Sequence, residues 1–188
     1  MRKLEKLVAI NNVQCILFRP RVSSDLYYIT IQNGTGCLAP VGQFTGDVIL
    51  QYPGCFDDGR TFHEFMHVLG IFHEQSREDR DSYVRIYPEN MKPGMDTQYV
   101  IYKNPVADMF NSPYDYASIM HYGKYDFSKN SLATIEPLQP NIKIGQRYNL
   151  TSGDIQLVRR YYNCSSTGLT LPPFTAPIEP GKKSIPKY

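Results

Sequence analysis

The spacing of apolar residues near the start of the chain predicts one helix followed by strands. Over residues 2–14, apolar side chains recur at helical spacing among charged ones, beginning with Leu4, Leu7 and Val8, which predicts an amphipathic helix. Three later runs are rich in β-branched and aromatic residues and predict strands. These runs cover residues 15–19, 26–31 and 47–51.

The residues after this region are predicted to form two helices, a stretch of loops and a tail. A helix is predicted over residues 61–69, and the scattered prolines of residues 88–113 predict loops. A last helix is expected to start at Thr151, which forms a capping box with Asp154. Its apolar face consists of Ile155, Val158 and Tyr162. Residues 165–188 contain five prolines and no apolar periodicity, so they are expected to form a Pro-rich flexible tail.

Length and charge narrow the class of protein. At 188 residues the chain is long enough for one domain with a core of its own. The formal net charge of +2 gives no reason to expect a nucleic-acid partner. No apolar run approaches the roughly 20 residues that cross a bilayer, so no membrane partner is expected either. A monomer is the expected state.

Four histidines occur in the chain, and three of them lie in one short run. In that run Glu64 follows His63, and His67, Gly70 and His73 come at intervals of three or four residues. Histidines four positions apart share one face of a helix, so His63 and His67 can both point at one ion. Neutral imidazoles suit zinc, and a catalytic zinc needs three protein ligands and one open position for water.

The neighbouring residues supply the other parts of such a site. Gly70 is expected to end the helix, because glycine tolerates positive φ just past a helix end. The chain can then turn back so that His73 reaches the metal as the third ligand. Glu64 lies about a third of a turn from His63. It is therefore better placed to take a proton from a zinc-bound water than to bind the zinc itself.

Structural interpretations compete with the metal site. HExxH alone occurs by chance in unrelated helices, and histidines on a helix face are also common as surface polar groups. Thr61 and Glu64 have the spacing of a capping box, which would make Glu64 a structural residue. The eleven-residue pattern is much more specific, and together with a later Met-turn it is the signature of the metzincin proteases.

Further motifs make the sequence resemble the astacin family of metzincin endopeptidases over residues 3–164. The histidine run continues with a charged extension like that family's, residues 118–122 match its Met-turn, and residues 145–155 resemble the tail of tolloid and hatching-enzyme catalytic domains. The resemblance implies an α+β, zincin-like catalytic domain of two subdomains. A mixed twisted sheet and the active-site helix would lie above a cleft near residue 73, and an irregular lower half would include a C-terminal helix.

The resemblance also implies a role for each matching residue. The ligands of one Zn²⁺ per chain would be His63, His67 and His73, and Glu64 would be the general base. Met120 would form a hydrophobic floor beneath the metal. Tyr122 would be a displaceable fifth ligand that then stabilises the oxyanion of the intermediate. Core packing is the alternative for Met120 and Tyr122, and His121 is not an expected ligand. The charged extension, assigned to structural ion pairs, contains Arg77, Asp79, Arg80 and Asp81.

These roles make the chain a zinc-dependent endopeptidase that hydrolyses peptide bonds of extracellular proteins. The edge segment at Cys37 and Leu38 would pair with the peptide substrate as an added strand. Arg147 is expected to bind an acidic residue just after the scissile bond, because residues 145–147 match tolloid-like enzymes. The alternative is that Arg147 is a solvated surface arginine.

The cysteines and glycosylation sequons point to an oxidising compartment. Sequence alone allows three pairings of the four cysteines. The resemblance selects Cys37 with Cys55 and Cys15 with Cys164. Sequons occur at Asn33, Asn149 and Asn163. Disulfides and sequons together predict a secreted glycoprotein.

The first residues depart from this picture. Residues 1–10 read as an amphipathic helix and not as the apolar core of a signal peptide. Astacins carry a signal, a propeptide and further mature residues before the point where this chain begins, and those residues include a strand and an N-terminus that tucks in near the position of Glu74. The peptidase domain, residues 1–164, is therefore interpreted as N-terminally incomplete. The alternative function is a catalytically incompetent binding module that keeps the substrate cleft.

Overall fold

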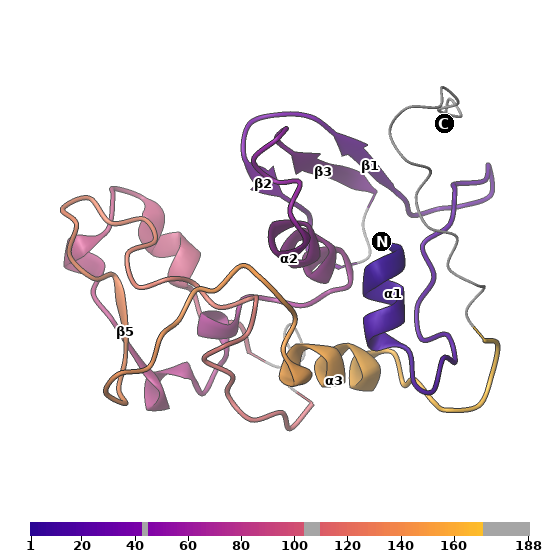
Figure 1. The fold of residues 1–188 in the computed structure, drawn as a ribbon. Coiled ribbons are helices and arrows are strands. Elements are labelled where there is room, and N and C mark those ends of the chain that lie inside the picture. The colour runs from indigo at the N-terminus through magenta and orange to yellow at the C-terminus, as the bar shows by residue number, and fades with distance from the viewer. Residues whose placement is uncertain (43–44, 104–109, 171–188) are drawn as a thin grey trace.

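The computed structural model describes residues 1–42, 45–103 and 110–170. These residues form three α-helices, a three-stranded sheet, a two-stranded ribbon and short 3-10 turns. In Figure 1 the three-stranded sheet and the α-helices lie in one half, and β5 of the ribbon lies in the other. Of the predicted Pro-rich tail, residues 171–188 lie outside the described residues. None of the helices in the described ranges combines the length and the apolar character needed to cross a membrane.

The three-stranded sheet of the first half is mixed. Its strands are β1 (Ile29–Gln32), β2 (Cys37–Leu38) and β3 (Gly46–Leu50), in the order β1-β3-β2. β1 runs parallel to β3, and β2 runs antiparallel to it and forms an edge of the sheet. The strands predicted over residues 26–31 and 47–51 are therefore confirmed with small shifts of their bounds.

The strand predicted over residues 15–19 is wrong, because no strand is assigned there. The Phe18 N–H donates to the Glu5 carboxylate at 2.7 Å and not to a neighbouring strand. The apolar residues of the segment still serve the core, where Ile16 is buried. A strand-like composition in this case reflects burial, and β-propensity largely measures fit to a half-buried surface.

Helix α1 (Arg2–Val8) is shorter than the predicted residues 2–14. It ends before Asn11 and Asn12, whose φ angles of 50° and 64° lie in the left-handed region that no helix continues through. Leu4 and Val8 are fully buried, as the predicted apolar face requires, whereas Leu7, the third residue of that predicted face, is exposed.

Helix α2 (Asp58–Val68) carries the first two histidines of the run and starts earlier than predicted. Asp57 caps it, accepting a hydrogen bond from the Arg60 N–H at 2.7 Å. The capping box proposed for Thr61 and Glu64 is therefore wrong, and the Thr61 hydroxyl donates to the Cys55 carbonyl at 2.9 Å. Glu64 is thus not needed to satisfy the start of the helix.

The predicted stop at Gly70 is confirmed. Gly70 has a φ of 89°, and its N–H donates to the His67 carbonyl at 2.8 Å while Ile71 N–H donates to the Met66 carbonyl at 3.0 Å. These two bonds form a Schellman motif, which satisfies the last carbonyls of the helix and reverses the chain. The reversal directs the following residues back toward His63 and His67.

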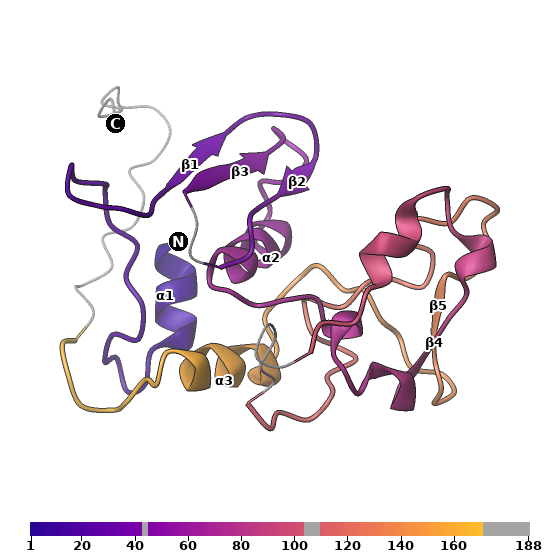
Figure 2. The ribbon, with the colours of Figure 1, turned by 180° about the vertical axis from the view of Figure 1, so that it is seen from behind.

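The last helix, α3 (Ser152–Tyr161), begins with the predicted capping box between Thr151 and Asp154. Figure 2 shows α3 running below α1 and α2. Arg159 donates to the Val8 carbonyl at 2.8 Å, and fully buried Val158 joins the core shared with α2. Helix α3 therefore packs against α1 and α2.

The second half has a separate core and little regular structure. Strands β4 (Val84–Ile86) and β5 (Ile135–Pro137) pair antiparallel. The 3-10 turns are η1 (Glu74–Ser76), η2 (Arg80–Ser82), η3 (Pro88–Asn90) and η4 (Met95–Tyr99). The predicted ion pairs form, with Arg77 between Glu74 (3.1 Å) and Asp79 (2.9 Å) and Arg80 next to Asp81 (3.0 Å).

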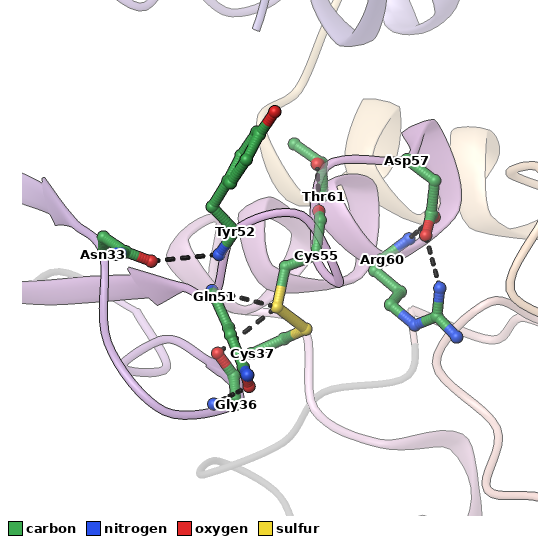
Figure 3. Close-up of a disulfide and its surroundings, with 9 residues drawn as sticks. All are labelled: Asn33, Gly36, Cys37, Gln51, Tyr52, Cys55, Asp57, Arg60 and Thr61. Carbon is green, nitrogen blue, oxygen red and sulfur yellow. Dashed lines mark hydrogen bonds and ion pairs between the residues drawn. A yellow bond between two sulfur atoms is a disulfide. The ribbon is translucent and has the colours of Figure 1, made fainter.

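Two disulfides close the fold. Cys15 is bonded to Cys164 and Cys37 to Cys55, which is the pairing that the resemblance implied. The second bond ties the edge strand β2 to the loop that leads into α2, as Figure 3 shows. The bond thereby links the edge strand β2 to the start of α2.

The start of α2 also touches the chain near residue 147. A Cβ on Gly59 would lie 1.8 Å from the Arg147 carbonyl oxygen, so two backbones meet where only glycine fits. We expect Gly59→Ala to lower the free energy of unfolding by about 3 kcal/mol, the upper range for overpacking, in urea denaturation. The control is Gly54→Ala, whose Cβ would meet nothing closer than 3.9 Å. Equal stability of the two variants would contradict the contact.

Candidate metal centre

Three imidazoles converge on one point between the two halves. The Nε2 atom of His73 lies 3.1 Å from Nε2 of His67 and 3.3 Å from Nε2 of His63. Two histidines come from α2, and the third comes from the segment after the Gly70 turn. Two nitrogens bound to one tetrahedral zinc at about 2.0–2.1 Å would lie roughly 3.3 Å apart. The triad therefore has the dimensions of a zinc site.

The partners of the other ring nitrogens fix the tautomers of two histidines. His63 Nδ1 lies 2.8 Å from the Ile119 carbonyl oxygen, and His67 Nδ1 lies 2.9 Å from that of Ile71. A carbonyl oxygen only accepts, so each Nδ1 carries the hydrogen and each Nε2 presents a lone pair. Backbone carbonyls commonly orient metal-binding imidazoles in this way.

Burial keeps the imidazoles neutral, as metal ligands must be. It lowers the pKa of His63 to about 3 and that of His67 to about 4, and it holds the pKa of His73 well below its ordinary value. Three neutral nitrogen donors at tetrahedral spacing are the donor set that zinc prefers. These three residues are also the group of potential metal ligands in the described part of the chain.

Glu64 lies beside the triad on α2 without belonging to it. Its side chain is buried, and desolvation raises its pKa to about 7, while the charge of Arg147 acts in the opposite direction. A carboxylate with a pKa near neutrality exchanges protons readily at that pH, which suits a general base. No other carboxylate joins the three imidazoles within the described ranges.

The turn at residues 118–122 is fixed by a residue of α3. Asp154 accepts a hydrogen bond from the Ser118 hydroxyl at 2.6 Å and another from the Ile119 N–H at 3.0 Å. This holds the Ile119 carbonyl that orients His63. Met120 is buried in the core of the first half, and adjacent Tyr122 is buried in the core of the second. The turn therefore joins the two halves beside the histidines.

Tyr122 lies against the metal triad. Its ring centroid is 4.4 Å from that of His73, and its hydroxyl donates to the Gln98 side-chain oxygen at 3.4 Å. Burial raises the pKa of the phenol above its ordinary value, which keeps the hydroxyl protonated. Its backbone N–H donates to the Gln75 side chain at 3.1 Å.

Two further residues were predicted to contact substrate. Arg147 is half-buried and donates to the carbonyls of His121 (2.9 Å) and Gln146 (2.8 Å), so it is not the freely solvated arginine of the alternative interpretation. Its charge influences the pKa of Glu64. Cys37 and Leu38 form the edge strand β2, and the Leu38 side chain is exposed.

Sequence reasoning did not assign the supporting roles of Asp154 and Gln75. Asp154 was identified only as part of a capping box, yet its carboxylate also accepts from Ser118 and Ile119. Gln75 follows the metal motif directly, is fully buried, and accepts from the Tyr122 N–H. The distant positions of these partners in the sequence gave no signal for either contact.

Comparison with known proteins agrees with this site. The sequence model of the astacin family of peptidases matches residues 4–163. Zinc metalloproteinase nas-13 of Caenorhabditis elegans is 42% identical over 161 residues, which make up 85% of this chain and 36% of that protein. The astacin-like metalloendopeptidase of Mus musculus is 42% identical over 142 residues, which make up 73% of this chain and 32% of that protein.

A solved structure is also similar. High choriolytic enzyme 1, a hatching-enzyme zinc-protease from the medaka fish Oryzias latipes, superposes with a TM-score of 0.76 at 36% identity, covering 87% of this chain and 81% of that one. The predicted metzincin-like α+β fold is therefore confirmed, and zinc is the cofactor that the relatives and the triad support. The chain spans 36% of nas-13 and 32% of the mouse protein.

Proposed function

Because this chain belongs to the astacin family of peptidases, we propose that it is a zinc-dependent endopeptidase. The observation that carries the proposal is the convergence of three Nε2 atoms at 3.1 and 3.3 Å around one point. His63, His67 and His73 would hold the metal. Bound zinc would supply a Lewis acid for the scissile carbonyl and would make a water acidic enough to be a nucleophile near neutral pH.

The other groups perform proton transfer and charge stabilisation. Glu64 takes the proton of the attacking water and later passes it to the leaving amine, which its place beside the triad supports. Tyr122 leaves Gln98 and donates its hydroxyl hydrogen to the oxyanion. Met120, packed in the core beside the histidines, acts as the floor of the site.

The proposal is tested by cleavage of a quenched fluorescent peptide with an acidic residue after the scissile bond. The protein is used with both disulfides oxidised and one equivalent of zinc. Cleavage that a chelator abolishes and that added zinc restores is the expected result. Stoichiometric zinc binding without cleavage would overturn the endopeptidase proposal and leave a zinc-binding protein that retains only peptide recognition.

We also propose that the peptide pairs with the edge strand at Cys37 and Leu38 and that Arg147 selects an acidic residue just after the scissile bond. The edge position of β2 among the described strands and the electrostatic influence of Arg147 on Glu64 support these roles. The protein acts on extracellular proteins as a monomer, in a compartment that permits its two disulfides. We propose that residues 1–164 form the peptidase domain. The first residues of the predicted flexible tail are instead held against the start of the chain, because Thr170 pairs with Val13 and the Gln14 N–H donates to the Leu169 carbonyl at 2.7 Å.

Replacing Arg147 with Ala is expected to lower the preference for Asp over Ala just after the scissile bond by about 5- to 10-fold. Solvent screens the attraction between a half-buried guanidinium and a carboxylate less than it screens the same attraction at the surface. Removing Arg147 should therefore slow cleavage of the peptide with Asp more than cleavage of the peptide with Ala. The preference is the ratio of kcat/KM values for two peptides that differ only at this residue. An unchanged ratio would show that Arg147 does not bind the acidic residue after the scissile bond.

A further inference from the structure

The backbone of the loop that leads into α3 is held by one side chain, that of Gln146. Its Oε1 atom accepts hydrogen bonds from the Tyr148 N–H at 2.8 Å and from the Asn149 N–H at 3.2 Å. Its Nε2 atom donates to the carbonyls of Asn149 and Ala117, each at 2.8 Å. The backbone N–H and carbonyl of Asn149 are therefore both satisfied by Gln146.

The side chain of Asn149 has no structural role in the described part of the chain. It is exposed, and its carboxamide makes no hydrogen bond to the residues that the structure describes. Asparagine is common in loops because it tolerates a left-handed backbone and because it caps helices. Asn149 does neither, since its φ is not positive and Thr151 is the N-cap of α3. Its amide nitrogen is therefore open to chemical modification.

The asparagines of the other two sequons have structural roles. Asn33 Oδ1 accepts a hydrogen bond from the Tyr52 N–H at 2.9 Å, as Figure 3 shows. Asn163 has a φ of 48°, in the left-handed region that asparagine tolerates better than most residues. The next residue, Cys164, is bonded to Cys15. Local structure thus accounts for these two asparagines but not for Asn149.

Thr151, the third residue of the sequon at Asn149, is engaged twice in the folded protein. Its side-chain oxygen accepts from the Asp154 N–H at 3.0 Å, and its hydroxyl donates to the Asp115 carboxylate at 2.5 Å. Recognition of a sequon requires a hydroxyl side chain at this position. A sugar would therefore be attached before Thr151 caps α3, and the exposure of Asn149 leaves room for it afterwards.

We propose that Asn149 is a modification site that carries an N-linked oligosaccharide. In the transfer step, Asn149 Nδ2 forms a bond to the anomeric carbon of the donor sugar. The bond from that carbon to the pyrophosphate of a lipid-linked oligosaccharide breaks, and the leaving lipid pyrophosphate takes up the amide proton. The inference goes beyond the endopeptidase function and does not depend on it. It requires only passage through an oxidising secretory compartment, which the two disulfides indicate.

The test is site-by-site mapping of glycans on the full chain, secreted from animal cells with both disulfides oxidised. An N-glycosidase converts each glycosylated asparagine to aspartate, and mass spectrometry of proteolytic peptides then identifies the occupied sites. We expect this conversion at Asn149 in most molecules. Asn149→Gln should reduce the mass of the untreated protein by one oligosaccharide. An unmodified Asn149, in cells that glycosylate a co-secreted control protein, would overturn the proposal.

Two replacements of Thr151 separate the sequon from the helix cap. Thr151→Asn keeps a side chain that caps helices well but destroys the sequon, so Asn149 should lose its glycan completely. Thr151→Ser keeps both the cap and the sequon, so the glycan should remain. A glycan on Asn149 in the Thr151→Asn protein would contradict sequon-dependent transfer. None of these measurements uses catalysis, so a failure of the endopeptidase proposal would leave their outcome unaffected.

Discussion

Replacing Glu64 with Gln is expected to lower kcat/KM by about 10²- to 10⁴-fold, the range for loss of a general base. Glutamine keeps the size of the side chain but accepts no proton at the attacking water. Glu64 does not belong to the metal triad, so the variant should bind one equivalent of zinc as tightly as the parent protein. The measurement is peptide cleavage together with zinc stoichiometry from the same preparation.

A control on the same segment makes this result specific. Glu78 lies in the charged extension of the metal motif and is exposed, so Glu78→Gln should change kcat/KM by less than about 2-fold. Loss of zinc from Glu64→Gln would assign Glu64 to metal binding instead of proton transfer. Retention of more than roughly a tenth of the activity would exclude it as the general base.

Removing the Cys15–Cys164 bond by double replacement with Ala is expected to destabilise the domain by about 4–5 kcal/mol. The two cysteines are 149 positions apart, so the bond restricts almost the whole unfolded chain. In the folded protein it links the segment after α1 to the segment after α3. Equilibrium urea denaturation of the zinc-loaded protein measures the change in the free energy of unfolding.

The second disulfide provides the comparison. Cys37 and Cys55 are only 18 positions apart, so removing their bond should cost about 3 kcal/mol, less than the long-range bond. The reverse order would show that strain or local packing, and not loop length, governs the stabilisation. Removal of the short bond should also weaken peptide binding at β2, because it frees the edge strand from the loop before α2.

Local features of the sequence predicted the parts of the metal site that depend on neighbours along the chain. The spacing of His63 and His67 follows from the helical repeat, and the stop at Gly70 follows from glycine's tolerance of a φ of 89°. The capping box of Thr151 and Asp154 is likewise a local interaction. Each of these predictions needed only a few consecutive residues.

Two predictions failed because another residue bonds to the backbone group in question or begins the helix earlier. Residues 15–19 have a strand-like composition, but a strand requires a neighbour, and the Phe18 N–H is bonded to Glu5 instead. Thr61 does not cap α2, because the helix begins earlier and Asp57 caps it while also bonding to the Arg60 side chain.

The sequence by itself identified the three histidines of the triad, because their spacing fixes which side chains share a face of α2 and which one follows the turn. Only the tertiary structure decided how Asp154 holds the turn that orients His63 and how Arg147 comes near Glu64. These partners are separated by dozens of residues, and their contact depends on α3 packing under α2. Helical periodicity encodes the first kind of information, while only the folded core encodes the second.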